Sequence, residues 1–296
     1  MKSRTSGEKK EAPVYSIDAF GPKAGWNDFY IEKFRDHVDA HPFVGKPHKH
    51  DFYLILFILN GGGSHTIDFT TYPMRADSMY LMTPGQVHTW NLTAKTDGYV
   101  VFFTRSFYQM QMIESNLLEF PFYHSIAASP VIQIAQRDPL DFIFKRMLKE
   151  YTAAAQPALR LLRAYLDVLL LETAKYYRAE GTATTHAVTY KLRKLEQLID
   201  EHFITHRRPA DYADLMNLAP TYLNSICKNN LGKTLTELIQ YRTILEAKRL
   251  LAYSDLHVNE LADKLGFADT SYFSRWFGKY AGCKPEEFRA SQLSGH

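Results

Sequence analysis

The sequence predicts an α+β protein of two domains: an N-terminal β-barrel with an attached helical segment, then an all-α domain with two helix-turn-helix units. Three observations support this fold class. Short strand-like runs separated by turns extend from about Val14 to Thr104, helical periodicity takes over after Ser106, and the C-terminal half contains a duplication. A chain of 296 residues, 46% of them hydrophobic, is long and apolar enough to bury two cores.

Changes in composition along the chain predict the domain boundaries. Residues 1–13 are charged and small and lack periodicity, which predicts a disordered tail. The barrel and its helices are expected to occupy residues 14–179. Residues 180–187 include the small polar run EGTATTH and are typical of a linker. Residues 188–296 show helical patterns throughout and form the second domain.

Bulk properties exclude several classes of protein. A net charge of +3 is too small to indicate a nucleic-acid partner by itself, so that function must rest on pattern. Cys227 and Cys283 form no CxxC pair, which argues against a disulfide scaffold and a cysteine zinc site. No secretory signal is visible, and no apolar run approaches the ~20 residues that span a membrane. We therefore expect a cytoplasmic protein without membrane contact.

The predicted barrel consists of short strands with clear turn signals. The apolar run FYLILFIL (52–59) is typical of a buried strand, and NGGG (60–63) follows as a turn. The run SHTIDFTTYP (64–73) then alternates polar and apolar residues. Strands this short at this spacing predict a small barrel or sandwich. The remaining strand-like runs are SMYLM (78–82), VHTWNL (87–92) and YVVFFT (99–104).

Two helices are predicted after the barrel, at 141–155 and 158–177. The second carries apolar residues on more than one face, because Tyr165, Val168 and Leu171 lie outside its leucine stripe. Two interpretations stay open: the helix covers the barrel, or it also forms a dimer seam. The leucine stripe consists of Leu159, Leu162, Leu166, Leu169 and Leu170.

The duplication aligns residues 212–233 with residues 261–283. In each copy a small residue allows two helices to cross closely. An Asn or Gly that can adopt positive φ then ends the first helix, and a large apolar residue fills the corner. A second helix follows, so each copy predicts a helix-turn-helix. The matched positions are Ala213 and Ala262, Asn217 and Gly266, and Leu218 and Phe267. The core-facing sets of the second helices are Leu223, Ile226 and Cys227, and Phe273, Trp276 and Phe277.

Residues from about 190 to 290 resemble the DNA-binding domain of the AraC/XylS family of bacterial transcription regulators. The second copy, LADKLGFADTSYFSRWFGKYAGCKPEEFR (261–289), carries the resemblance most strongly, whereas the first departs from it at Asn217 and Cys227. The resemblance implies binding to a double-stranded DNA operator. A helix from Thr234 to Ala252 would be ~28 Å long. That length suits two recognition helices in successive major grooves, about 34 Å apart.

The polar face of each second helix supplies the candidate DNA contacts. Asn224 can make a bidentate contact to adenine and Arg275 to guanine, whereas Lys228 and Lys279 suit phosphates. The alternative for every polar position is a solvated helix face. The full set is Thr221, Asn224, Ser225, Lys228, Thr270, Ser271, Ser274, Arg275 and Lys279.

The β-rich half resembles the cupin-type sensor domain that often precedes this DNA-binding domain. Metal-binding cupin enzymes use an HxH pair, an acidic residue and a later histidine. Here His48, His50 and His88 occupy the histidine positions, but Leu54 and Ile55 lie where the carboxylate is expected. The stretches that carry the resemblance are PHKHDFY (47–53), GSHTIDF (63–69) and MTPGQVHTW (82–90).

Three interpretations of these histidines stay open. They are structural groups hydrogen-bonded at a barrel rim, polar contacts for a small-molecule effector, or ligands of a zinc or iron ion. We expect no metal cofactor, with His48, His50 and His88 as the candidates if one binds. The expected effector-binding residues are His48, His50, Phe52, His65, Met82, His88 and Trp90, assigned from strand alternation.

Together these patterns predict a ligand-responsive transcription regulator and not an enzyme. We expect a homodimer that binds double-stranded DNA and a small-molecule effector, and that contacts RNA polymerase if it is an activator. One alternative is a metal-dependent cupin enzyme with an appended helical domain. Another is a barrel that binds nothing and only dimerises.

Overall fold

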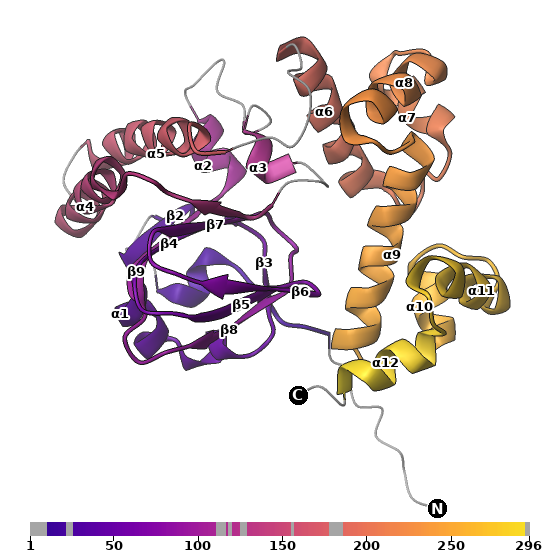
Figure 1. The fold of residues 1–296 in the computed structure, drawn as a ribbon, viewed down its shortest axis with the longest axis horizontal. Coiled ribbons are helices and arrows are strands. Elements are labelled where there is room, and N and C mark those ends of the chain that lie inside the picture. Colours follow the sequence, from indigo (N-terminus) through magenta and orange to yellow (C-terminus); the bar gives the residue numbers. More distant parts are fainter. Residues whose placement is uncertain are drawn as a thin grey trace, which may run out of the picture. The chain divides into compact units, whose positions relative to one another are not determined.

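The computed structural model describes residues 11–21, 26–110, 117, 120–124, 129–154, 157–177 and 186–293. The chain forms two compact units, one of Val14–Glu180 and one of Gly181–His296 together with Met1–Pro13 (Figure 1). Most of the predicted tail, 1–13, and linker, 180–187, lies outside the described residues. Within the described residues, no helix is both long and apolar enough to cross a membrane.

The β-rich unit contains two main antiparallel sheets. A five-stranded sheet has the order β10-β7-β4-β9-β2, and a three-stranded sheet has the order β6-β5-β8. A short parallel pair, β1-β3, lies beside them. The elements are β1 (Val14–Tyr15), η1 (Ile17–Phe20), β2 (Phe29–Lys33), α1 (Phe34–Ala40), η2 (Pro42–Gly45), β3 (Lys49–His50), β4 (Tyr53–Asn60), β5 (Gly63–Ile67), β6 (Thr70–Met74), β7 (Ser78–Met82), β8 (His88–Leu92), β9 (Asp97–Phe103), α2 (Arg105–Gln109), α3 (Pro121–His124), β10 (Val131–Gln133), α4 (Arg137–Ala153) and α5 (Ala158–Ala174).

The five-stranded sheet is buried on both faces, which explains the continuous apolar run of β4. One face lies under α4, where the Phe144 ring stacks on Phe57 and Tyr99 at centroid distances of 5.4 and 5.0 Å. On the other face the rings of Phe52 and Phe102 are 4.5 Å apart. A strand buried on both sides loses the polar alternation of a surface strand. The predicted buried strand at 52–59 is therefore confirmed, and its interior face points toward the histidines.

The alternating run 64–73 forms a hairpin. Its strands β5 and β6 are joined at Asp68, whose φ of 52° is in the left-handed region. Asp tolerates this region because its short side chain can bond locally. Here the Asp68 carboxylate accepts a hydrogen bond from the Val87 amide at 3.2 Å.

The second unit is helical, and one long helix joins its two halves. Figure 1 shows α7 and α8 at one end of α9, and α10, α11 and α12 at the other. Helix α9 starts at a capping box in which the Thr234 amide donates to Glu237 Oε2 at 2.7 Å and the Glu237 amide donates back to Thr234 Oγ1 at 3.2 Å. The elements are α6 (His186–His202), α7 (Pro209–Met216), α8 (Pro220–Leu231), α9 (Leu235–Tyr253), α10 (Val258–Lys264), α11 (Thr270–Ala281) and α12 (Pro285–Leu293).

The duplicated turns have the same backbone geometry. Asn217 and Gly266 adopt φ of 52° and 73°. In each turn the following amide donates to the carbonyl of the small residue five positions earlier, at 2.9 Å. This six-to-one bond, in which the first helix ends, is characteristic of a Schellman motif. Two helix-turn-helix units, α7–α8 and α10–α11, are therefore confirmed. The bonded pairs are Leu218 with Ala213 and Phe267 with Ala262.

The predicted core-facing sets are buried with one exception. Trp276 is only half-buried, whereas the other five side chains are at most 6% exposed. The Trp276 ring packs between Phe267 and Tyr280, at 5.0 and 5.3 Å, and covers the edge of the core. A ring this large is seldom fully buried.

Candidate DNA-binding surface and histidine cluster

The two second helices expose matching polar faces. On α11, Arg275 and Lys279 are exposed, and so is Ser271 near the first turn. Thr270 and Ser274 are half-buried. The exposed candidates on α8 are Thr221, Ser225 and Lys228. These positions stay predicted DNA contacts.

Asn224 has a structural role that its sequence position did not reveal. Its side chain is half-buried, and its Oδ1 accepts a hydrogen bond from the Leu235 amide at 3.0 Å. The bond ties α8 to the first residue of α9, where backbone amides have no partner within the helix. A bidentate contact to adenine needs the amide oxygen and nitrogen directed at one base edge. In this conformation the oxygen is engaged within the protein, so the predicted base contact of Asn224 would require this hydrogen bond to break.

Replacing Asn224 with Ala is expected to destabilise the helical unit by about 1 kcal/mol, because the first turn of α9 loses a capping bond. DNA affinity should fall by a similar factor on specific and random sequences. Urea unfolding and paired gel-shift titrations measure the two effects. Ser225→Ala, at the exposed neighbouring position, is the control and should leave stability unchanged. Lost discrimination at one base pair with unchanged stability would show instead that Asn224 reads a base.

Two exposed tyrosines occupy equivalent places that the sequence analysis missed. Tyr222 precedes the buried Leu223, and Tyr272 precedes the buried Phe273, with exposed fractions of 43% and 55%. The Tyr222 hydroxyl accepts a hydrogen bond from Lys191 at 3.2 Å. The repeat in the sequence could have revealed these two tyrosines, because each lies one residue before a matched core position.

Several basic side chains hold the helical unit together. The Arg289 guanidinium donates to the carbonyls of Leu251 and Leu256 at 3.1 and 2.6 Å and fastens α12 to the end of α9. The Arg207 guanidinium donates to the Leu265 carbonyl and lies 4.0 Å above the Phe267 ring. The number of Lys and Arg residues in the helical unit therefore exceeds the number available to contact DNA.

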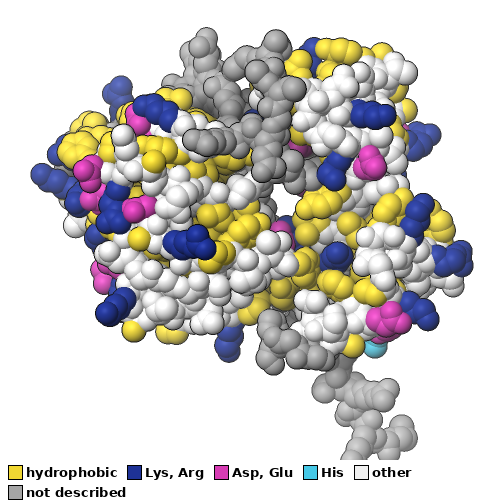
Figure 2. Space-filling view, viewed as in Figure 1, with side chains coloured by type: hydrophobic (Ala, Val, Ile, Leu, Met, Phe, Trp, Pro, Cys, Tyr) yellow, Lys and Arg dark blue, Asp and Glu magenta, His cyan; other side chains and the backbone are white. Residues whose placement is uncertain are grey.

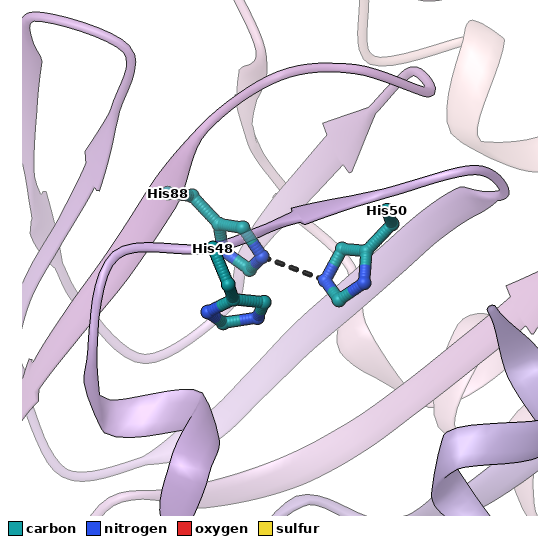
Figure 3. Close-up of side chains that lie close together, drawn as sticks. All are labelled: His48, His50 and His88. Carbon is teal, nitrogen blue, oxygen red and sulfur yellow. Dashed lines mark hydrogen bonds between the residues drawn. The ribbon is translucent and has the colours of Figure 1, made fainter. Parts of the chain in front are cut away.

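The β-rich unit encloses a cluster of four histidines. His48 and His50 come from the segment at β3, His65 from β5 and His88 from β8, and all are at most 3% exposed. His50 Nε2 lies 2.7 Å from His88 Nε2, and His65 Nε2 lies 3.0 Å from His88 Nδ1. Figure 3 shows the His50 and His88 rings directed at one another with His48 beside them. One ligand atom from each of His48, His50 and His88 fits within 4.8 Å of the others.

Burial sets the charge state of this cluster. Desolvation lowers the pKa of His48, and it lowers the pKa values of His50 and His88 well below the usual range. The pKa of His65 falls to about 3 for the same reason. The four imidazoles are therefore neutral at pH 7, the form in which a ring nitrogen can bind a metal ion.

The predicted effector-binding residues lie in the interior and do not form an open rim. All seven are at most 7% exposed. The expectation that these residues line an open barrel rim is wrong, because the N-terminal segment covers the end of the barrel where they lie. Phe20, from η1, is 2% exposed, and its ring lies 5.9 Å from both His50 and Phe52 and 4.9 Å from Phe102.

Two family models match the chain. An AraC-like ligand binding domain matches residues 28–180, more than half of the chain, and a helix-turn-helix domain matches residues 212–291. The chain belongs to the AraC family of transcription regulators. The resemblance stated from the sequence is thus confirmed for both domains.

Relatives in the AraC family match most of the chain at low identity. The uncharacterized HTH-type transcriptional regulator YfiF of Bacillus subtilis is 25% identical over 254 residues, which are 82% of this chain and 78% of the relative. The HTH-type transcriptional activator RhaR of Mannheimia succiniciproducens is 21% identical over 243 residues, 82% of this chain and 86% of the relative. Among solved structures, ToxT of Vibrio cholerae covers 88% of this chain and 98% of its own, with 14% identity and a TM-score of 0.45.

Membership of the AraC family gives the two units their general roles. The protein is a DNA-binding transcription regulator with a ligand-binding domain of the AraC type. A family of regulators points away from catalysis as the function of the β-rich unit.

Proposed function

We propose that this AraC-family protein is a cytoplasmic homodimer that reads one operator with two helices per protomer, and that a small-molecule effector in the barrel changes its affinity for DNA. The observation that carries the proposal is the matched pair of helix-turn-helix units at the two ends of α9. With 19 residues, α9 is ~28 Å long. The recognition helices α8 and α11 can then enter successive major grooves of one DNA face.

The exposed faces of these helices suggest a division of roles. Arg275 suits a bidentate contact to guanine, and Lys228 and Lys279 suit phosphates on either side. The short polar side chains Thr221, Ser225 and Ser271 can bond base edges or phosphates. Tyr222 and Tyr272, at matched positions early in each helix, add hydroxyl contacts to the DNA backbone.

The outer surface of α5 supports a homodimer. Four leucines of its inward stripe are fully buried and Leu159 is half-buried. On the outer surface, Leu161, Val168 and Leu171 are 37%, 44% and 53% exposed. Figure 2 shows apolar side chains gathered on the surface over α4 and α5. Residues at i, i+7 and i+10 share one helix face, which is the pattern of a helix–helix seam. We propose that α5 covers the barrel and also pairs with its partner copy.

Regulation requires that the effector binds the DNA-competent and DNA-incompetent states with different affinity. The seven interior residues of the barrel are the proposed contacts, and entry of a ligand requires Phe20 and η1 to move. Activation of transcription is proposed by analogy with the relative described as an activator, and implies contact with RNA polymerase.

Genome-wide mapping of the DNA bound by the full-length protein tests this function. We expect a small set of promoter sites with a shared motif of two elements about one helical turn apart. In a thermal-shift screen of the same protein against small metabolites, one chemical class should raise the unfolding temperature. The reason is that a ligand that binds the native state stabilises the native state. Binding spread evenly over the genome would contradict sequence-specific regulation.

A further inference from the structure

We propose that His48, His50 and His88 form a three-histidine site for a transition-metal ion of the Zn²⁺ class inside the sensor barrel. Each side chain is at most 3% exposed, and the three come from two separate parts of the chain. Buried polar atoms are normally hydrogen-bonded, so unpartnered nitrogens in such a place need an explanation. A bound metal ion supplies one.

His48 presents a lone pair that has no partner among the described residues. Its Nδ1 lies 2.7 Å from the Lys46 carbonyl oxygen, which can only accept, so Nδ1 carries the proton. In the neutral ring Nε2 then has no proton, and its lone pair can bind a metal ion. It is buried, and no group within the described residues bonds to it. A histidine ligand held by a backbone carbonyl through its other nitrogen is a common arrangement in metal sites.

His50 and His88 point their Nε2 atoms at each other across 2.7 Å. Without an ion, one Nε2 carries a hydrogen and donates a hydrogen bond to the other. When an ion binds, the ring that carries this hydrogen loses it from Nε2 and gains a proton at its own Nδ1, so both Nε2 atoms become ligands and the total number of protons is unchanged. Tetrahedral coordination at about 2.0–2.1 Å puts ligand atoms ~3.4 Å apart. The two rings must therefore separate by less than the width of an atom.

His65 supplies the outer support for this site. Its Nε2 lies 3.0 Å from His88 Nδ1 and can accept a hydrogen bond from the Nδ1–H of His88 when His88 Nε2 binds metal. Hydrogen-bond partners of this kind orient the ligand ring and raise its basicity. The sequence pattern of metal cupin enzymes did not call for His65, so this contact comes from the structure alone.

The donor set selects the class of ion. Three neutral imidazoles favour Zn²⁺, Co²⁺ or Fe²⁺ over Mg²⁺ or Ca²⁺, which prefer oxygen ligands. Leu54 lies where a carboxylate ligand was expected and is fully buried. Three protein ligands also leave a coordination position open to water or an organic effector. That the metal takes part in sensing an effector rests on the proposed function. That these residues bind a metal does not.

Titration of chelator-treated, full-length protein with Co²⁺ tests the site. We expect one equivalent to bind, with the visible d–d bands of a four- or five-coordinate site, and Zn²⁺ to displace it. His50→Phe keeps a ring against Phe52 and Phe102 and should abolish the bands. His41→Ala, which removes a histidine outside the cluster, is the control and should retain them. His65→Leu should weaken binding about 10–100-fold without abolishing it.

Two further readouts separate loss of the site from loss of the fold. The circular dichroism spectrum of metal-free His50→Phe should match that of the metal-free wild type. His48→Gln gives a second ligand variant if His50→Phe does not fold. In the wild type, Zn²⁺ should raise the unfolding temperature. No Co²⁺ bands in the wild type, or bands that survive both ligand variants, would overturn the proposal. Specific DNA binding in that case would leave the regulatory function intact.

Discussion

Arg275→Ala is expected to cost about 1–3 kcal/mol of binding free energy on the cognate operator and to relax discrimination at one base pair. Arg275 is exposed on α11, and a guanidinium can bond to a guanine edge through two donors. Gel-shift titrations against the operator, its single-base variants and random DNA measure the effect. Random DNA should be affected less, because on random DNA the variant loses only one positive charge and no base contact.

The matched control for Arg275 is Lys95→Ala. Lys95 is an exposed cation of the β-rich unit, so its removal changes the net charge equally without touching the recognition helices. Operator affinity should be unchanged. Equal losses for Arg275→Ala on operator and random DNA would show that Arg275 contacts phosphate and does not read a base.

The double variant Val168→Glu, Leu171→Glu should convert the dimer to a monomer, because it places two like charges on each side of an apolar seam. Operator affinity should then fall by about 10²–10⁴-fold, since two linked modules no longer bind together. Sedimentation at increasing protein concentration and gel-shift titration measure the two consequences. Val168 and Leu171 are outward-facing, so the fold of α5 should survive.

Phe142→Glu serves as the control for the seam. Phe142 is 62% exposed on α4, so the change replaces a surface apolar side chain with the same charge on a different helix. It should leave the dimer intact. A double α5 variant that remains dimeric, or a monomeric wild type, would contradict the proposed seam.

The sequence predicted best those features that local chemistry dictates. Asn217 and Gly266 end their helices in the left-handed region because few other residues reach it at low cost, so two matched turns could be recognised without a structure. The apolar run of β4 likewise revealed a strand buried on both faces. The inward direction of the histidines followed from strand alternation.

Features that depend on distant partners could not be predicted. Asn224 is polar and lies on a recognition helix, yet its oxygen bonds to the start of α9. Phe20 closes the end of the barrel only because η1 folds back over His50, a contact between segments 30 residues apart in the sequence. The sequence placed His65 in the barrel interior, but its bond to His88 Nδ1 depends on the pairing of β5 with β8 and was not predicted. Periodicity reports which face a residue occupies but not which group it meets there.

A methylation-interference footprint on a mapped operator shows whether the two helix-turn-helix units of one chain read the same DNA site. We expect each protomer to protect two major-groove segments on the same DNA face, about 10 base pairs apart. Arg275→Ala should remove interference in one segment of each pair, and Lys228→Ala should weaken binding without changing the base pattern. Interference confined to a single groove, or a pair of segments that both survive Arg275→Ala unchanged, would show that the two units do not read DNA together in this way.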